Sequence, residues 1–329
     1  MIVVTGGAGF IGSALVCSLN ELGHDDILVV DHLGTTEKWK NLVPLRFADY
    51  LDKDQFIGRL EDNAFGSSID TILHLGACSS TTERDATYLM ENNFRYTERI
   101  GHWWEKHPDT RFIYASSAAT YGDGTHGYRD GTDSLDCLRP LNMYGYSKHL
   151  FDKVAFRNGW LKRIVGLKYF NVFGPNEYHK GDMRSVINKA FRRVRDEGVI
   201  SLFRSYHPQY GDGEQLRDFI YVKDAVAMTL FFMEQRSAGG LFNIGTGVAR
   251  SWNDVAKALF SALGKKPVIE YIEMPEEIQD KYQYFTQADP SALRDAGCTV
   301  VCRSLEESIT DFVVNYLQHA AHLEPQGNR

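Results

Sequence analysis

The sequence predicts an α/β chain, in which a doubly wound parallel sheet is combined with a smaller, interdigitated α/β lobe. Short apolar runs alternate with longer amphipathic stretches, which is the pattern of parallel strands joined by helices. A glycine-rich turn joins the first apolar run to the first amphipathic stretch. This alternation loosens after about residue 175. We therefore expect a first domain at 1–175, with returning pieces near 217–247, and a second lobe at 176–329.

The composition fits a folded chain that works on small molecules. Of its 329 residues, 43% are hydrophobic and 24% are charged, so a sizeable core can be buried. The net charge of −7, without a block of like charges, argues against a nucleic-acid surface. Apolar runs are too short to cross a membrane and the MIVVTGG start lacks a secretory pattern, so we expect a cytoplasmic protein. The five cysteines include no CxxC pair, and we expect reduced thiols and no metal site.

The apolar runs place the expected elements along the chain. Strands are expected at Ile2–Thr5, Ile27–Asp31, Thr71–Leu75, Arg111–Ser116 and Ile164–Tyr169. Helices are expected between them at Gly12–Leu22, Glu83–Lys106 and Gly145–Asn158. In the second half we expect a strand at Phe219–Val222, a helix at Lys223–Gln235, a strand near Phe242–Gly247 that returns to the sheet, and a final helix at Leu305–His319.

The turn at residues 5–12, TGGAGFIG, has the spacing of a dinucleotide-binding loop. It fits GxGxxG at Gly7, Gly9 and Gly12, and GxxGxxG when Gly6 is counted first. Glycines allow backbone N–H groups to approach a pyrophosphate, and the start of the following helix adds its positive end. Asp31 ends the second expected strand, 19 residues after Gly12, within reach of a ribose hydroxyl. The first domain is therefore predicted to be an NAD(P)-binding Rossmann domain.

A tyrosine and a lysine four residues apart predict proton-transfer chemistry. Tyr144 and Lys148 share one face of an expected helix. A nearby ammonium and an oxidised nicotinamide ring favour the phenolate, which lowers the tyrosine pKa from its usual value near 10. The tyrosine can then take a proton from an alcohol while hydride leaves the carbon. Ser116 ends a strand and is predicted to hydrogen-bond the same alcohol.

These motifs resemble the extended short-chain dehydrogenase/reductase family acting on nucleotide sugars. The resemblance runs through TGGAGFIG, HLGACSSTTE, YASSAATYG, PLNMYGYSK, YFNVFGP, RDFIYVKDA and FNIGTG. Within it, GACSSTTE at 76–83, EYHKG at 177–181 and YQYFTQAD at 282–289 resemble the ADP-heptose 6-epimerases of lipopolysaccharide synthesis. This implies an isomerase that inverts C6 of ADP-D-glycero-β-D-manno-heptose through a 6-keto intermediate, with ADP-heptose as its partner, in a homo-oligomer that is a pentamer in the family.

The residues near the catalytic pair limit the reaction. Sugar dehydratases of the family carry an Asp-Glu pair where this chain has Ala118 and Ala119, which argues against dehydration. Net oxidation to a sugar acid needs a cysteine nucleophile, and Cys78 is the candidate, although its position favours packing near the nicotinamide. The alternatives are a UDP-hexose 4-epimerase and, outside enzymes, a silent NAD(P)-binding regulator, which would not need a complete triad.

Inversion needs a proton donor on each face of the ketone, or one donor that serves both. The resemblance implies that Lys180 is the second acid/base, with His179 as an alternative. The predicted catalytic set is therefore Ser116, Tyr144, Lys148 and Lys180. Predicted substrate contacts are Ser116, Asn171, Asp182, Lys189, Phe203, Arg204, Ser205, Tyr206, Arg217 and Tyr282.

The expected cofactor is NADP, one per subunit and tightly held, with NAD as the alternative. Asp31 favours NAD because a carboxylate repels a 2′-phosphate, whereas Lys38, Lys53 and His32 favour NADP. The family's use of NADP decides between them. Predicted cofactor contacts are Gly6, Gly9, Phe10, Ile11, Gly12, Asp31, His32, Lys38, Lys53, Leu75, Gly76, Ala77, Cys78, Ser79, Asn92, Lys148 and Val172.

Overall fold

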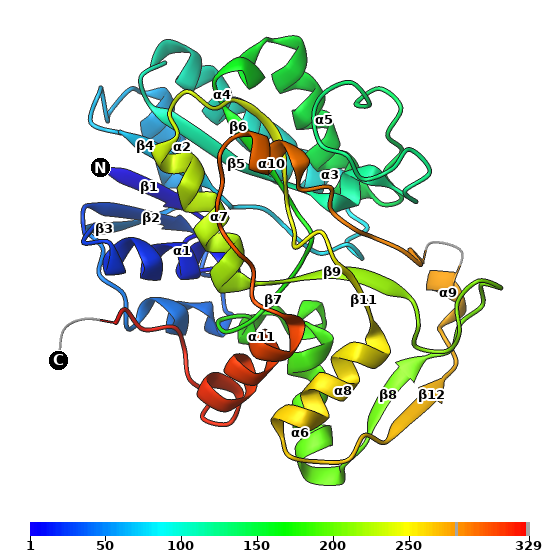
Figure 1. Ribbon diagram of the computed structural model, residues 1–329. Coiled ribbons are helices and arrows are strands. Elements are labelled where there is room, and N and C mark those ends of the chain that lie inside the picture. The colour runs from blue at the N-terminus through cyan, green and yellow to red at the C-terminus, as the bar shows by residue number, and fades with distance from the viewer. Residues whose placement is uncertain (280–281, 327–329) are drawn as a thin grey trace.

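A seven-stranded parallel sheet forms the centre of the larger lobe in the computed structural model, which describes residues 1–279 and 282–326 (Figure 1). The spatial order is β10–β6–β5–β4–β1–β2–β3. The strands are β1 (Ile2–Thr5), β2 (Ile27–Asp31), β3 (Asp49–Asp52), β4 (Thr71–His74), β5 (Arg111–Ser117), β6 (Val165–Tyr169) and β10 (Gly240–Ile244). The predicted α/β class is confirmed, and the five strands expected in the first half lie within a residue of their predicted bounds.

Helices cover both faces of this sheet because alternate strand residues point to opposite sides. Val4 packs in a core with α1 (Phe10–Glu21) and α7 (Val222–Glu234), whereas Val3 packs in the other core. That second core contains side chains of α2 (Lys53–Glu61), α4 (Tyr96–Lys106) and α5 (Met143–Arg157). With both faces buried, the strands lack the alternating polar pattern of a half-exposed sheet.

The helix predicted at Glu83–Lys106 begins at Ala86 and is not α-helical throughout. It begins as α3 (Ala86–Leu89), passes through a π turn at Met90–Arg95, and continues as α4. The final predicted helix likewise consists of α11 (Leu305–Phe312) followed by a π turn at Val313–Leu317. Shorter 3₁₀ turns lie at Glu37–Leu42, Ala118–Tyr121, Trp160–Lys162 and Tyr178–Met183.

The smaller lobe is built from the later part of the chain (Figure 1). It has a hydrophobic core of its own. Its sheets have the orders β11–β9–β7 and β12–β8. The elements are β7 (Asn171–Phe173), α6 (Val186–Glu197), β8 (Ile200–Phe203), β9 (Leu216–Tyr221), β11 (Ala249–Ser251), α8 (Trp252–Ala262), β12 (Ile269–Ile272) and α9 (Glu276–Gln279). The short helix α10 (Ser291–Asp295) packs instead against β10 in the larger lobe. Between β9 and β11 the chain returns to the larger lobe as α7 and β10, so the lobes are interdigitated in sequence. The boundary at residue 175 stays a prediction.

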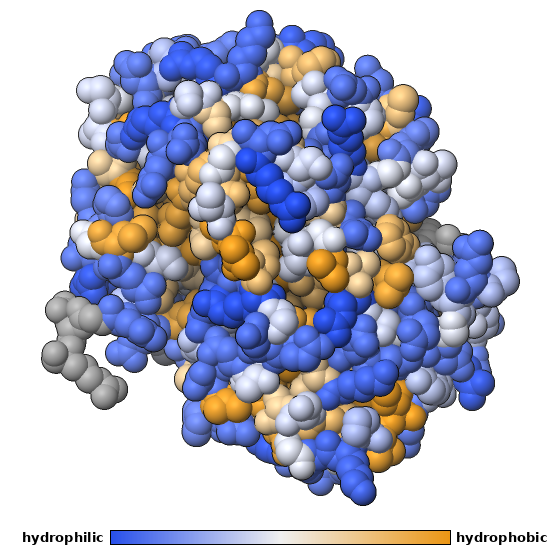
Figure 2. Space-filling view, viewed as in Figure 1, coloured by the Kyte–Doolittle hydropathy of each residue, from blue (hydrophilic) through white to orange (hydrophobic). Residues whose placement is uncertain are grey.

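The face of the molecule in Figure 2 is mostly hydrophilic, with apolar side chains in small groups between polar ones. Among the residues that the structure describes, no helix combines the length and apolar character needed to cross a membrane.

Candidate active site

Two cavities meet at the carboxyl ends of the central strands. The first, about 660 Å³, is lined by the glycine loop, the ends of β4 and β5, the start of α5, and residues Asn171, Val172, His179, Lys180 and Met183. The second, about 700 Å³, extends toward the smaller lobe and includes Arg217 and Tyr282. Both cavities are lined by Ser117, Tyr144 and Asn171. The crevice at the carboxyl ends of parallel strands is where sheets of this kind bind ligands.

The glycine loop packs too closely for side chains. Gly6 has a φ of +67°, and a Cβ there would lie 2.8 Å from the backbone nitrogen of Gly76. A Cβ on Gly12 would lie 2.1 Å from the carbonyl oxygen of Gly6. Gly9 caps α1 without a side-chain hydrogen bond, and no acidic residue stands in the first turn of the helix. This helix start therefore fits the pyrophosphate of a dinucleotide.

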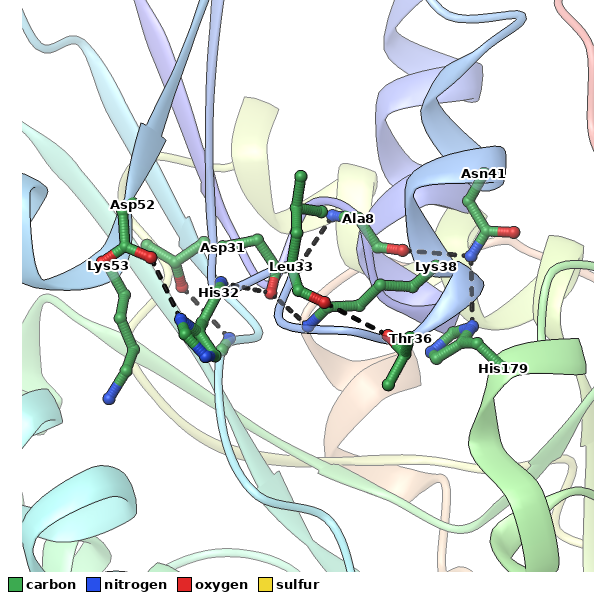
Figure 3. Close-up of polar contacts among 12 residues, drawn as sticks. Ala8, Asp31, His32, Leu33, Thr36, Lys38, Asn41, Asp52, Lys53 and His179 are labelled. Atoms are coloured by element: carbon green, nitrogen blue, oxygen red, sulfur yellow. Dashed lines mark hydrogen bonds and ion pairs between the residues drawn. The ribbon is translucent and has the colours of Figure 1, made fainter.

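The carboxylate of Asp31 is already occupied by protein donors (Figure 3). Its Oδ2 accepts from the backbone N–H of Ala8 at 2.9 Å. Its Oδ1 accepts from the N–H of His32 at 2.7 Å and from Nζ of Lys38 at 2.6 Å. Asp31 is buried, so these bonds leave it little capacity for a ribose hydroxyl. The ion pair with Lys38 also compensates its charge.

The predicted cations lie around a smaller cavity of about 140 Å³ beside Asp31. Lys38, Lys53, His32 and Asn92 line it. Lys53 donates to Oδ1 of Asn92 at 2.9 Å. His32 lies 3.1 Å from Oδ2 of Asp52 (Figure 3).

Asn93, the neighbour of Asn92, bonds the backbone of the loop after β4. Asn93 accepts from the N–H of Cys78 at 2.8 Å and donates to its carbonyl at 3.0 Å. It also donates to the hydroxyl of Ser147 at 3.1 Å. The π turn at 90–95 sets which asparagine faces the loop, and the sequence pattern carries no signal for such a turn.

The structure moves the predicted serine role by one residue. The hydroxyl of Ser116 is buried and donates to Oδ2 of Asp152 at 2.7 Å. The serine whose side chain lowers the pKa of Tyr144 is Ser117, which lines both cavities together with that tyrosine. Because successive residues of a strand point to opposite faces, only one of the two serines can face the alcohol. The geometry therefore favours Ser117, which lines both cavities, over Ser116, which lines only the first, for that role.

Burial dominates the acid–base properties of the tyrosine and the lysine. Burial raises the pKa of Tyr144, and the hydrogen bond from Ser117 opposes this. Burial lowers the pKa of Lys148 to about 8, opposed by the negative charge of Asp152. Nζ of Lys148 donates to the carbonyl of Ala115 at 2.8 Å, which fixes the ammonium behind the end of β5. In the protein alone, the tyrosine pKa therefore lies above its usual value rather than below it.

Lys180 reaches the first cavity from the loop that follows β7. Its Nζ lies 5.5 Å from the ring centroid of Phe10, at the start of α1. Burial lowers its pKa, and the carboxylate of Glu177 opposes that effect. His179 lines the same cavity, and burial lowers its pKa to about 4, so it is neutral at pH 7. Tyr144 and Lys180 thus stand on one cavity and come from different parts of the chain.

The predicted substrate residues fall into two groups. Asn171, Arg217 and Tyr282 line the second cavity, where the guanidinium of Arg217 lies 5.1 Å from the ring centroid of Tyr282. Lys189 is exposed and donates to the carbonyl of Asp182, and neither lines either cavity. The run Phe203–Tyr206 also lies outside both linings. Sequence reasoning missed several lining residues, namely Thr81, Thr82, Glu83, Arg84, Ser117, Leu141 and Gln283.

Comparison with known proteins decides the family. A model described as the NAD dependent epimerase/dehydratase family matches residues 2–245. This chain belongs to that family. Curated relatives named ADP-L-glycero-D-manno-heptose-6-epimerase include those of Nitratidesulfovibrio vulgaris, 54% identical over 97% of this chain and 99% of the relative, and Fusobacterium nucleatum, 47% identical over 96% and 98%.

Solved structures of epimerases share the fold of this family member. The crystal structure of the Helicobacter pylori ADP-L-glycero-D-manno-heptose-6-epimerase gives a TM-score of 0.78 at 27% identity, covering 95% of each chain. A UDP-glucose 4-epimerase from Thermotoga maritima, solved with UDP-glucose, gives 0.78 at 25% identity over 97% and 99%. The epimerase/dehydratase family uses a nicotinamide cofactor, and the glycine loop and the first cavity fit one.

Proposed function

We propose that this epimerase/dehydratase family member inverts C6 of ADP-D-glycero-β-D-manno-heptose to give the ADP-L-glycero-β-D-manno epimer. The observation that carries the proposal is that Tyr144 and Lys180 face one cavity from different parts of the chain. A curated ADP-heptose 6-epimerase is 54% identical to this chain over nearly the full length of both proteins, which supports the choice of substrate. The UDP-glucose 4-epimerase is a more distant relative, at 25% identity.

The protein residues supply proton transfer and orientation. A bound nicotinamide supplies reversible acceptance of a hydride from the carbinol carbon. Tyr144 accepts the hydroxyl proton, and Ser117 orients that hydroxyl by hydrogen bonding. Lys148 is held between the carbonyl of Ala115 and the charge of Asp152, and its ammonium favours the phenolate form of Tyr144.

Lys180 serves the opposite face of the ketone. Its lowered pKa brings the ammonium closer to the range in which it can give and regain a proton. His179 is a weaker candidate because burial keeps it neutral at pH 7, so it has no proton of suitable acidity to donate. The positions after Ser117 are Ala118 and Ala119, so this wall lacks the carboxylates that dehydration requires.

For the cofactor we propose NADP. Lys38 and the N–H of Ala8 already satisfy Asp31, which weakens the argument for a free 2′-hydroxyl there. Lys53 and His32 line the same small cavity and add donors for a phosphate. We also propose that the protein is a homo-oligomer, with the pentamer as the expected form, and that it is cytoplasmic. Light scattering measures the molar mass of the oligomer, and cell fractionation tests the location.

Direct turnover tests the proposed function. The purified chain is incubated with ADP-D-glycero-β-D-manno-heptose without added dinucleotide, and the configuration at C6 is read by NMR. UDP-galactose serves as the competing substrate. Conversion of the heptose alone supports the proposal. Preferential conversion of UDP-galactose at C4, or turnover of neither substrate by a dinucleotide-loaded protein, contradicts it.

A further inference from the structure

A single buried amide connects two segments that contribute to the lining of the first cavity. Asn41 is 1% exposed and lies on the 3₁₀ turn Glu37–Leu42, which also carries Lys38. Its Nδ2 donates to the carbonyl of Ala8 in the glycine loop at 3.0 Å and to the carbonyl of Asn176 at 3.0 Å. The same nitrogen lies 3.4 Å from Nδ1 of His179 (Figure 3). The amide therefore joins the loop near Asp31 to the loop that carries Lys180.

The second of these bonds acts close to Lys180. Asn176 is fully buried with a φ of +75°, a left-handed conformation that is uncommon for a residue with a side chain. Its side chain donates to the hydroxyl of Ser13 on α1 at 2.9 Å. The next residue, Glu177, accepts from the backbone N–H of Lys180 at 3.0 Å. Asn41 thus bonds the chain at Asn176, two residues before the turn Tyr178–Met183 that carries Lys180.

The C-terminal segment at 321–323 bonds the same two loops through Asn41, Asn176 and Tyr178. Nδ1 of His322 lies 2.8 Å from Oδ1 of Asn41, and the N–H of Leu323 donates to Oδ1 of Asn176 at 2.9 Å. The hydroxyl of Tyr178 donates to the carbonyl of Ala321 at 2.8 Å. With these contacts the amide of Asn41 has partners on both its nitrogen and its oxygen, so its orientation is fixed.

We propose that Asn41 is a positioning residue that couples the adenosine end of the cofactor cavity to the placement of Lys180. Binding of a dinucleotide restrains the turn of Lys38, and Asn41 passes that restraint to the backbone of Asn176. The loop at 176–183 is then held with Lys180 facing the cavity. This inference rests on the proposed function only for the role of Lys180, because the coupling itself can be measured without substrate.

The test compares Asn41→Ala with Asn20→Ala. Asn20 is also buried, at 3% exposed, and its amide also bridges separate segments, bonding the backbone of Arg46 at both its nitrogen and its oxygen. It lines neither cavity, so it controls for the loss of a buried amide. Hydrogen–deuterium exchange of the 176–183 peptides is measured with and without NADP, and kcat is measured at saturating NADP. The milder variant His322→Ala, which removes one of the bonds, covers the case in which Asn41→Ala does not fold.

In wild type and Asn20→Ala, we expect NADP to slow exchange in 176–183. In Asn41→Ala, or in His322→Ala to a smaller degree, that protection is lost and kcat falls about tenfold or more. Equal protection in all variants overturns the coupling. A wild type that shows NADP-dependent protection but no heptose turnover contradicts the proposed function and leaves the coupling supported. Loss of protection with unchanged kcat contradicts the role assigned to Lys180 positioning.

Discussion

The hydroxyl of Ser116 donates to Oδ2 of Asp152 at 2.7 Å, on the side of β5 that packs against α5. Oδ1 of the same carboxylate accepts from Tyr114 at 2.8 Å, and Nζ of Lys168 lies 3.8 Å from Oδ2. Asp152 is fully buried, so these partners stabilise a charge that has no contact with water. The Ser116 hydroxyl therefore supports α5 at the edge of the first cavity, and the adjacent Ser117 lines both cavities.

Replacing the two serines separately distinguishes support from catalysis. Ser117→Ala is expected to lower kcat by about 10–10³ and to leave the melting temperature nearly unchanged, because it removes an orienting bond in the cavity. Ser116→Ala is expected to destabilise the fold by about 1–3 kcal/mol, because it removes one partner of a buried carboxylate. Thermal unfolding and steady-state kinetics on both variants check this. The reverse pattern would return the catalytic role to Ser116.

Removal of either proposed acid/base, Tyr144 or Lys180, should lower turnover by a comparable factor. Tyr144→Phe keeps the ring and removes the hydroxyl, so we expect turnover to fall by about 10²–10⁴. The turnover of Lys180→Ala is expected to fall by a similar factor. Lys189→Ala is the control, since Lys189 is exposed on the neighbouring helix and lines neither cavity. If Lys180→Ala turns over normally while Tyr144→Phe is inactive, one tyrosine serves both faces and the two-base account is wrong.

The dinucleotide preference should depend on the lysine paired with Asp31. We expect wild type to release NADP on denaturation, identified by mass spectrometry. Lys38→Ala removes a charge-assisted bond and exposes the Asp31 carboxylate, so NADP affinity should fall about 10–100-fold and NAD affinity much less. Lys40→Ala is the matched control, because Lys40 lies on the same turn and pairs with Glu37. Recovery of NAD alone, with Lys38→Ala binding unchanged, would refute NADP as the cofactor.

The stability of the fold should depend on the ionisation of Asp130. Burial raises the pKa of Asp130 to about 6 from 3.8, and its Oδ2 accepts from the N–H of Asn243 on β10. Charging this group therefore opposes folding above pH 6, and the cost disappears as the pH falls from about 6 toward 3.8. Asp130→Asn should stabilise the protein by roughly 1–3 kcal/mol at pH 7.5 and by less at pH 5. Melting temperatures at both pH values measure this, with Asp133→Asn, an exposed residue of the same loop, as control. An equal change at both values would contradict it.

Local sequence patterns were sufficient to predict the strands of the larger lobe that lie in apolar runs, and the glycine loop. Runs such as Ile2–Thr5 and Ile27–Asp31 are buried on both faces, so their apolar character alone marks them as strands. The smaller lobe was harder to predict, because its strands other than β9 have only three or four residues and are partly exposed. β12 alternates between half-buried and exposed residues and includes a glutamate, which is a weak strand signal.

Sequence alone could not assign roles where a one-residue choice depends on backbone geometry. Ser116 and Ser117 are identical in type, and only the pleat of β5 decides which faces the cavity. Asn92 and Asn93 differ in the same way across a π turn. The contacts of Asn41 join segments more than a hundred residues apart, and no local spacing indicates them.

Transfer of the C6 hydrogen tests the central claim most directly. The substrate is prepared as ADP-D-glycero-β-D-manno-heptose with deuterium at C6 and incubated in ordinary water without added dinucleotide. The account predicts an L-glycero product that keeps the deuterium at C6, because the hydrogen is removed and returned within one active site with no net redox change. Replacement of the deuterium by solvent hydrogen, formation of a keto-deoxy sugar, or a stoichiometric requirement for NAD(P) would contradict it.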